Sequence, residues 1–540
     1  MDYLSLCLIC KDENDYLPEW LDYHILMGVD RFYIYDNVSR ISLREALQDY
    51  IERGWVVVVD IPGSKVQLYA YDHCLRTFGA RTFWMGFIDT DEFLVLKTDP
   101  DLKEFLRGYE AYAGLAVSSL FFGSNGHKTP PVDGQISSYV KRTHSAFEDN
   151  RFIKSIVQPK FIQLPNSPHD FVYKAGAWCV NENRVRVDDQ QFPHQSEKIQ
   201  LNHYFCRSQE EIEAKLKRGG GARSHALTRG RFDAINAHSD VEDKTILEVL
   251  QRMFDRAQND LGAPSNSSGR LTLLSKLRAL AETRRPAPFE LAIPDLPIQR
   301  PELMEWITLK TESEAASVVH DVEQYGRILL KQLTRQPAHI PLYVGLSYNY
   351  LSLNDPVASW QALSQAWQTA PNSYIVLIGM CNYFLATKNF SMAEKTSRLL
   401  QTIAPQALLP MGFLAESLIG QGRYEDALKI GVPVVELAAM VGELPKGMGN
   451  YLVKLMADYL LKKKDFDGAV KLWEAGAKCQ LGKEALIELS RALLLADNAS
   501  EARRRLLQAQ AFAPHDERVG ALLVQANAEI SASRRNQKKK

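Results

Sequence analysis

The sequence predicts an N-terminal α/β domain followed by an all-α solenoid, and three observations lead to this prediction. Short apolar segments alternate with helical ones from the first residues, a pattern typical of parallel strands joined by right-handed crossovers. One buried apolar run ends abruptly in the carboxylates of Asp89, Asp91 and Glu92. The second half of the chain repeats with a period of 34 residues.

The first elements are expected in the order strand, helix, strand, helix, strand, at residues 4–10, 16–27, 31–35, 43–53 and 55–61. Gly28 is expected just beyond the first helix, where a left-handed backbone favours glycine. Asp12 or Asn14 could cap the first helix, and Asn37 or Ser39 the second. This βαβαβ order predicts a parallel sheet.

Polar side chains follow three of the predicted strands where each strand ends: Asp12 and Glu13, Asp36 and Asn37, Asp89 and Asp91. The carboxyl ends of parallel strands are where α/β sheets bind ligands. In an extended Asp-x-Asp both carboxylates point to one side and form an oxygen half-site for a divalent cation that holds a diphosphate. The alternative is a polar strand end whose acids cap a helix.

Several motifs, in the expected order, resemble glycosyltransferase family 92 and its bacterial relatives. They are Cys10-Lys11-Asp12-Glu13, Tyr33-Ile34-Tyr35-Asp36-Asn37, Phe87-Ile88-Asp89-Thr90-Asp91 and Asn202-His203-Tyr204. The resemblance covers about residues 1–226. It implies a GT-A fold, here an α/β domain with a Rossmann-like mixed sheet, a nucleotide-sugar donor and an inverting mechanism.

The resemblance also implies site residues. Asp89 and Asp91, completed by His203, would bind the metal ion, and an imidazole ligand favours Mn²⁺ over Mg²⁺. Lys11, Asp12, Glu13, Asp36 and Asn37, with Asp89, would hold the nucleotide. From the residues alone, His203 could equally be a hydrogen-bonded core histidine, and the acids could be helix caps.

A cationic, glycine-rich run follows His203. Lys215, Arg218 and Arg223 could close over the diphosphate as a lid, or could simply form a solvated helix end. Residues 122–127 are rich in turn formers and are placed beside the acceptor. The catalytic base stays open among several side chains: Glu92, His127, Glu148, Asp149, His169 and Asp170.

The seven cysteines are scattered, which favours free thiols in a reducing compartment. Cys7 and Cys10 lie three apart in a predicted strand and should therefore face opposite sides of the sheet. This placement favours buried structural thiols over a redox pair or a zinc site.

The 34-residue period resembles tetratricopeptide repeats. Pro356, Phe390 and Tyr424 are 34 residues apart, and a small residue follows three positions after each: Ser359, Ala393 and Ala427. After an insertion, the register continues with Phe466 and Ala469 and then with Ala499 and Ala502. Small residues let paired helices approach closely. An unrelated helical bundle is the alternative.

The predicted domains are residues 1–255 (catalytic), 256–337 (connecting helices and proline-rich linker), 338–515 (about five repeats) and 516–540 (terminal helix and basic tail). A net charge of −1 argues against a nucleic-acid binder. The first apolar run is itself a strand and lacks a basic leader, so we expect a bacterial protein, cytoplasmic or peripheral at the inner face of the membrane.

The predicted function is metal-dependent transfer of a hexose from a UDP-sugar to a glycan or glycosylated acceptor, with the repeats binding a protein partner or positioning the acceptor. One alternative keeps the fold but hydrolyses or transfers a phosphate. A second is a non-catalytic repeat scaffold with a degenerate front domain.

Overall fold

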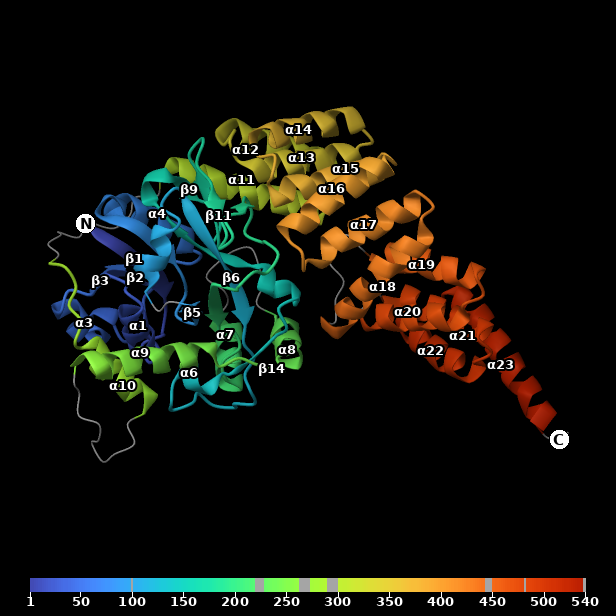
Figure 1. Ribbon diagram of the computed structural model, residues 1–540, viewed down its shortest axis with the longest axis horizontal. Helices are drawn as coiled ribbons and strands as arrows, with labels where there is room; N and C mark the ends of the chain where they lie inside the picture. Colours follow the sequence, from blue (N-terminus) through green and yellow to red (C-terminus); the bar gives the residue numbers. More distant parts are fainter. Residues whose placement is uncertain are drawn as a thin grey trace. The chain divides into compact units, whose positions relative to one another are not determined.

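The computed structural model describes residues 1–98, 101–218, 228–261, 272–288, 300–441, 449–479 and 482–537 (Figure 1). The chain divides into two units, residues 1–145 with 149–376 and residues 377–540 with 146–148. The first unit contains the sheet and the first helical pairs, and the second unit is helical. Among the described residues, no helix is both long and apolar enough to cross a membrane.

Four parallel strands form the first half of the sheet. They are β1 (Asp2–Cys10), β2 (Arg31–Asp36), β3 (Val56–Asp60) and β4 (Thr82–Phe87), in the order β4-β1-β2-β3. Helices α1 (Leu17–Leu26), α2 (Leu43–Ala46), α3 (Gln48–Glu52) and α4 (Gln67–Phe78) connect them. Cys10 is paired with Asp36, and Asp36 with Asp60, so these three strands end level. The predicted parallel βαβαβ arrangement is confirmed.

The second half makes the sheet mixed. β8 (Ile153–Val157) runs antiparallel between β4 and β6 (Gly114–Phe121). β13 (Ile199–His203) pairs in parallel with β6 and antiparallel with β5 (Glu92–Leu96). In this register His203 lies opposite Glu92. This pairing brings His203, more than a hundred positions further along the chain, to the end of the Asp89–Glu92 segment.

The positions of the cysteines and the end of the first helix agree with the predictions made from the sequence. Cys7 packs in one apolar cluster and Cys10 in another, on opposite faces of β1, and all seven cysteines are buried thiols. Gly28, just beyond α1, has a φ of +98°.

The predicted caps were wrong. No side chain caps α1; instead, Asp12 Oδ1 accepts from Arg40 N and Asn14 donates to the Ile41 carbonyl. Ser42 caps α2, because the loop from β2 runs further before the helix begins.

Four helices of the first unit precede or begin the predicted repeats: α11 (Pro301–Val318), α12 (Val322–Arg335), α13 (Ile340–Ser352) and α14 (Pro356–Thr369). Their apolar residues Leu303, Trp306 and Leu342 pack with Leu164 of β9 (Ile162–Pro165) and Val172 of β10 (Phe171–Tyr173). Trp306 Nε1 also donates to Asn166 Oδ1 at 3.2 Å. The helical pairs therefore begin as part of the sheet-containing unit.

The predicted repeat register is confirmed in the described helices. The second helix of each pair begins at the recurring residue of its repeat: α14 at Pro356, α16 (Phe390–Ile403), α18 (Tyr424–Val441), α20 (Phe466–Lys478) and α22 (Ala499–Phe512). The corresponding small residues are fully buried: Ser359, Ala393, Ala427, Ala469 and Ala502. The first helices are α15 (Tyr374–Ala386), which spans the division between the units, and α17 (Leu408–Gly420), α19 (Gly449–Lys462) and α21 (Gly482–Leu495). Helix α23 (Glu517–Gln537) follows the last pair.

Candidate active site

The Asp89-Thr90-Asp91 segment is a turn between β4 and β5. Glu92 N donates to the Asp89 carbonyl at 3.0 Å, closing the turn. The expectation of an extended Asp-x-Asp with both carboxylates on one side was therefore wrong. Asp89 Oδ2 lies 2.7 Å from Lys154 Nζ, and its Oδ1 accepts from Gln67 Nε2. The Asp91 carboxylate contacts different side chains from those that Asp89 contacts.

Asp91 faces His203 and Lys215. Asp91 Oδ1 lies 3.7 Å from His203 Nε2, and Asp91 Oδ2 lies 2.7 Å from Lys215 Nζ. Burial raises the pKa of Asp91, but the nearby cations, Lys215 foremost, outweigh burial and hold this pKa well below its usual range. Burial also lowers the pKa of His203 to about 3. At neutral pH the site therefore presents a carboxylate and a neutral imidazole.

Among the described residues, no group of three or more His, Cys, Asp or Glu side chains is arranged to hold a metal ion, so this pair offers two candidate ligands and not a complete site. Oxygen and nitrogen ligands lie about 2.1 Å from divalent metal ions, so adjacent ligands of one ion are roughly 3–4 Å apart, and the Asp91–His203 distance falls in that range. The other ring nitrogen, His203 Nδ1, lies 3.5 Å from Glu92 Oε1. A hydrogen-bonded carboxylate behind a ligating histidine usually fixes its ring orientation, but Glu92 Oε1 has no hydrogen-bond partner among the described residues. Asp91 and His203 are the residues that would hold the ion, while Asp89 has other partners.

Lys154 is a site residue that the sequence analysis did not select. Its ammonium group is 1% exposed and lies 2.7 Å from Asp89 and 3.2 Å from Glu92. Burial alone would lower the pKa of Lys154, but these two carboxylates hold it well above its usual value. Burial raises the pKa of Glu92 to about 8. A lysine inside an apolar strand was the available signal, because lysine is almost never fully buried without a partner.

A cavity of about 850 Å³ adjoins Asp91 through Lys215 and Glu13. This volume is within the usual range for small-molecule sites. The lining comes from the loop after β1, from α1 and α3, from residues 130–134, and from α7 (Gln209–Arg218) and α10 (Leu273–Ala281). Asp12 and Glu13 line it, as the nucleotide prediction requires.

The other predicted nucleotide residues lie outside this lining. Asp36 is buried, and its two carboxylate oxygens accept from Ser39 N at 2.8 Å and Leu43 N at 3.1 Å. Asn37 donates to the carbonyls of Ile61 and Gly63. Lys11 is exposed on the loop after β1. The structure gives Asp36 and Asn37 loop-holding contacts, and nucleotide binding by these residues stays a prediction.

The candidate bases are not brought together. Glu92 is fully buried among Lys154, His203 and the Asp89 backbone. His127 Nε2 lies 3.2 Å from the Ser138 carbonyl, and His169 Nδ1 lies 3.0 Å from the Ile153 carbonyl. Asp149 is paired with Arg231. The geometry selects none of them as the base.

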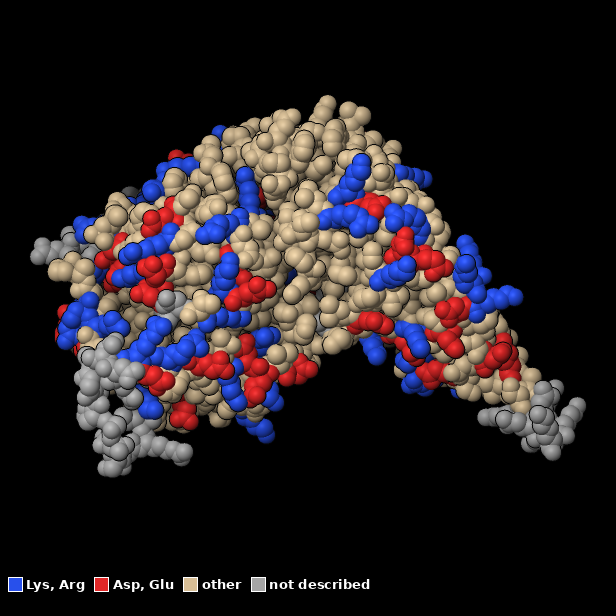
Figure 2. All heavy atoms as spheres, in the orientation of Figure 1, with Lys and Arg blue, Asp and Glu red and all other residues tan. Residues whose placement is uncertain are grey.

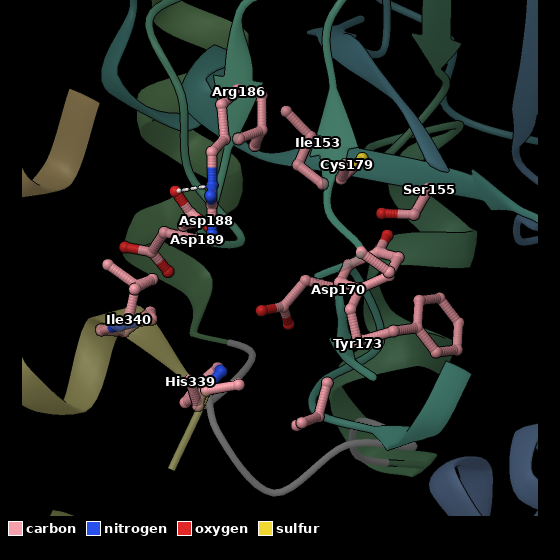
Figure 3. Close-up of a pocket in the computed structure, with 16 residues that line it drawn as sticks. Ile153, Ser155, Asp170, Tyr173, Cys179, Arg186, Asp188, Asp189, His339 and Ile340 are labelled. Carbon is pink, nitrogen blue, oxygen red and sulfur yellow. Dashed lines mark hydrogen bonds and ion pairs between the residues drawn. The ribbon is translucent and has the colours of Figure 1, made fainter. Parts of the chain in front are cut away.

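Asp170 lines a second, much smaller cavity (Figure 3). Its volume of about 30 Å³ is enough for a water molecule. Asp170, Asp188 and Asp189 face it together with His339 at the start of α13. None of its lining residues is shared with the large cavity. Asp170 therefore does not line the large cavity.

The predicted lid is described only in part. Lys215 lies on α7, bonded to Asp91 and to the Phe205 carbonyl. Arg218 is the last residue of α7. Arg223 lies outside the described residues.

Comparison with known proteins finds a family match for the first part of the chain. Residues 3–217 match the sequence profile of glycosyltransferase family 92. A glycosyltransferase family 92 protein of Ricinus communis is 29% identical over 188 residues, which are 34% of this chain and 33% of that protein. One of Oryza sativa subsp. japonica is 32% identical over 184 residues, or 33% of this chain and 31% of that protein. The matches thus span about a third of these curated relatives.

Solved structures of repeat proteins also resemble this chain. A tetratricopeptide repeat protein from Parabacteroides merdae has 11% identity and a TM-score of 0.31, covering 52% of this chain and 93% of that one. Pseudomonas aeruginosa PilF has 14% identity and a TM-score of 0.33, covering 42% and 100%. The likeness is weak at these TM-scores, and the repeat architecture stands on the helix boundaries given above.

Proposed function

Because residues 3–217 form a glycosyltransferase family 92 domain, we propose that this protein transfers a hexose from a UDP-sugar to a glycan or glycosylated acceptor, with inversion and with a divalent metal ion, Mn²⁺ or Mg²⁺. The observation that carries the proposal is the Asp91–His203–Glu92 arrangement beside a cavity of ligand size. It supports a metal-assisted reaction at that position.

The side chains suit the departure of a nucleoside diphosphate. A bound metal ion would act as a Lewis acid on the leaving diphosphate. Asp91 is anionic and His203 neutral, which are the forms that bind cations. Glu92 Oε1 lies 3.5 Å from His203 Nδ1, and the Lys154 ammonium group contacts both Glu92 and Asp89. Lys215 is close enough to Asp91 to stabilise charge that develops on the diphosphate.

A panel of nucleotide sugars tests this function. Full-length protein with Mn²⁺ should release UDP from one UDP-sugar, faster with a glycan acceptor than with water, and EDTA should abolish the release. Free sugar as the only product at every acceptor concentration would favour phosphohydrolase chemistry instead. No turnover and no nucleotide binding across the panel would favour the scaffold alternative.

The helical pairs offer a surface for a partner or an acceptor. Helices α13 and α14 contain no Lys, Arg, Asp or Glu, and the surface over them is almost free of charged side chains (Figure 2). Val357, Trp360 and Trp367 on α14 are 67%, 37% and 46% exposed. We infer that this face binds a protein partner or the acceptor. Replacing both tryptophans with serine should spare donor hydrolysis and impair transfer to the natural acceptor.

A further inference from the structure

Arg207 occupies a fixed, buried position next to the proposed donor site. It follows β13 by four residues, in a left-handed backbone conformation with φ of +50°. Its side chain is only 2% exposed, yet it lines the large cavity together with Glu13 and Lys215. No motif in the sequence marks this residue for the site.

The contacts of Arg207 leave part of its guanidinium group unused. Nη1 lies 2.6 Å from Glu13 Oε2, Nε donates to Gln135 Oε1 at 2.9 Å, and the group stacks 4.0 Å from the centre of the Tyr16 ring. Nη2 is buried and has no hydrogen-bond partner among the described residues. Leaving a buried donor unpaired costs about 1–3 kcal/mol, and more for a charged group, so an acceptor brought by a ligand would remove a penalty.

The surrounding charges indicate which ligand would supply that acceptor. Arg207 and Lys215 face the carboxylates of Glu13, Asp91 and Glu211. Two cations against three anions leave this corner with an excess negative charge, which would repel a free anion. An anion that arrives with a divalent cation meets no such repulsion. The planar guanidinium fork matches phosphate oxygens better than a lysine does.

We propose that Arg207 binds a phosphate oxygen of the donor diphosphate through Nη2. The inference deepens the proposed function and rests on it. In this role Arg207 contacts the leaving group from a fixed position. Its ion pair with Glu13 holds the guanidinium group in place.

The test is the affinity of the full-length protein for UDP and for uridine, measured by calorimetry with Mn²⁺. Arg207→Lys keeps the charge but loses the second nitrogen. We expect its UDP affinity to fall at least tenfold and its uridine affinity to stay within twofold. Arg31→Lys is the matched control: Arg31 is 1% exposed and paired with Asp2 at 2.9 Å, but lies outside the cavity lining. Its UDP affinity should match that of the wild type.

A second variant keeps the proposal testable should Arg207→Lys fail to fold. Tyr16→Leu removes the stacking on the guanidinium group and the hydrogen bond from the Tyr16 hydroxyl to Glu211 without changing any charge, and should weaken UDP binding several-fold while sparing uridine. Unchanged UDP affinity in the folded Arg207 or Tyr16 variant would overturn the role of Arg207, and so would an equal loss in Arg31→Lys. A wild-type protein that binds neither UDP nor uridine would instead overturn the proposed function.

Discussion

At the residue scale, the site consists of charged and polar side chains that contact one another in the protein interior. Asp89, Lys154, Glu92, His203, Asp91 and Lys215 form a continuous chain of contacts from β8 to α7. The sequence predicted the carboxylates and, through the family resemblance, His203. It did not predict Lys154 or Arg207. These residues reach the site only because β8 and β13 pair with distant strands in the folded sheet.

Lys154 gives the first prediction at this scale. Lys154→Met should lower the free energy of unfolding by about 1–3 kcal/mol, because it leaves the partly exposed Asp89 carboxylate and the buried Glu92 without their cation. Urea unfolding measures this change. Lys244→Met is the control: Lys244 and its partner Glu242 are about half exposed, so that variant should change stability by less than about 1 kcal/mol. Equal, small losses in both variants would show that Lys154 does not stabilise the turn.

Asp36 gives the second. Asp36→Ala should lower the free energy of unfolding by about 1–2 kcal/mol, because its carboxylate accepts two backbone N–H groups of the loop before α2. Calorimetry with UDP on the same variant examines the predicted nucleotide contact, which a loss of about 1.5–3 kcal/mol in binding would support. Undiminished stability would contradict the loop-holding role.

At the element scale, local patterns predicted helices well and the acidic turn poorly. The second helices of the repeats begin at the recurring residues, because a small buried residue marks each close helix contact. Helix α12 begins 34 residues before α14 and fits the same register. Its fourth residue is Tyr325, whereas the other second helices have a small residue there, so the repeat pattern did not reveal α12 in the sequence. The conformation of Asp89-Thr90-Asp91 depends on pairing between β5 and β13, a non-local contact that no local pattern encodes.

Helix α1 gives a prediction about pH. His24 lies inside it, fully buried, with Nδ1 2.8 Å from the Trp20 carbonyl and Nε2 accepting from Leu94 N. Burial lowers the pKa of His24 to about 3. Between that value and the unfolded pKa of about 6.5, the unfolded chain binds the proton and the folded chain does not. This histidine therefore contributes stability that is lost as pH falls through the window.

His24→Phe removes that titration. The variant should be less stable than the wild type at pH 7.5, because Leu94 N loses its acceptor. The difference should shrink as pH falls below 6.5, by up to about 1.4 kcal/mol per pH unit. Urea unfolding at pH 7.5, 5.5 and 4.5 measures it. A difference that stays constant with pH would contradict a neutral buried imidazole.

At the scale of the whole molecule, the sheet and the first helical pairs form one unit. Sequence reasoning predicted an α/β domain and a solenoid, but not the residues that join them, because Leu303 and Trp306 meet Leu164 and Val172 only in the folded chain. A fragment of residues 1–288 should therefore expose apolar surface and aggregate, whereas residues 1–371 should stay soluble and bind UDP with Mn²⁺. Light scattering and calorimetry compare them. A soluble, UDP-binding fragment of residues 1–288 would show that α11–α14 are dispensable.

We propose that Asp91 and His203 hold the metal ion of a nucleotide-sugar transferase, and Mn²⁺ binding in the presence of UDP is the decisive measurement. Electron paramagnetic resonance titration of the full-length wild type should show a saturable Mn²⁺ site. Asp91→Asn should bind Mn²⁺ about 100-fold more weakly while remaining folded, since ligand-sphere changes cost at least about 10–100-fold. Asp188→Asn, in the separate small cavity, should bind like the wild type. Wild-type Mn²⁺ affinity in Asp91→Asn would contradict the account.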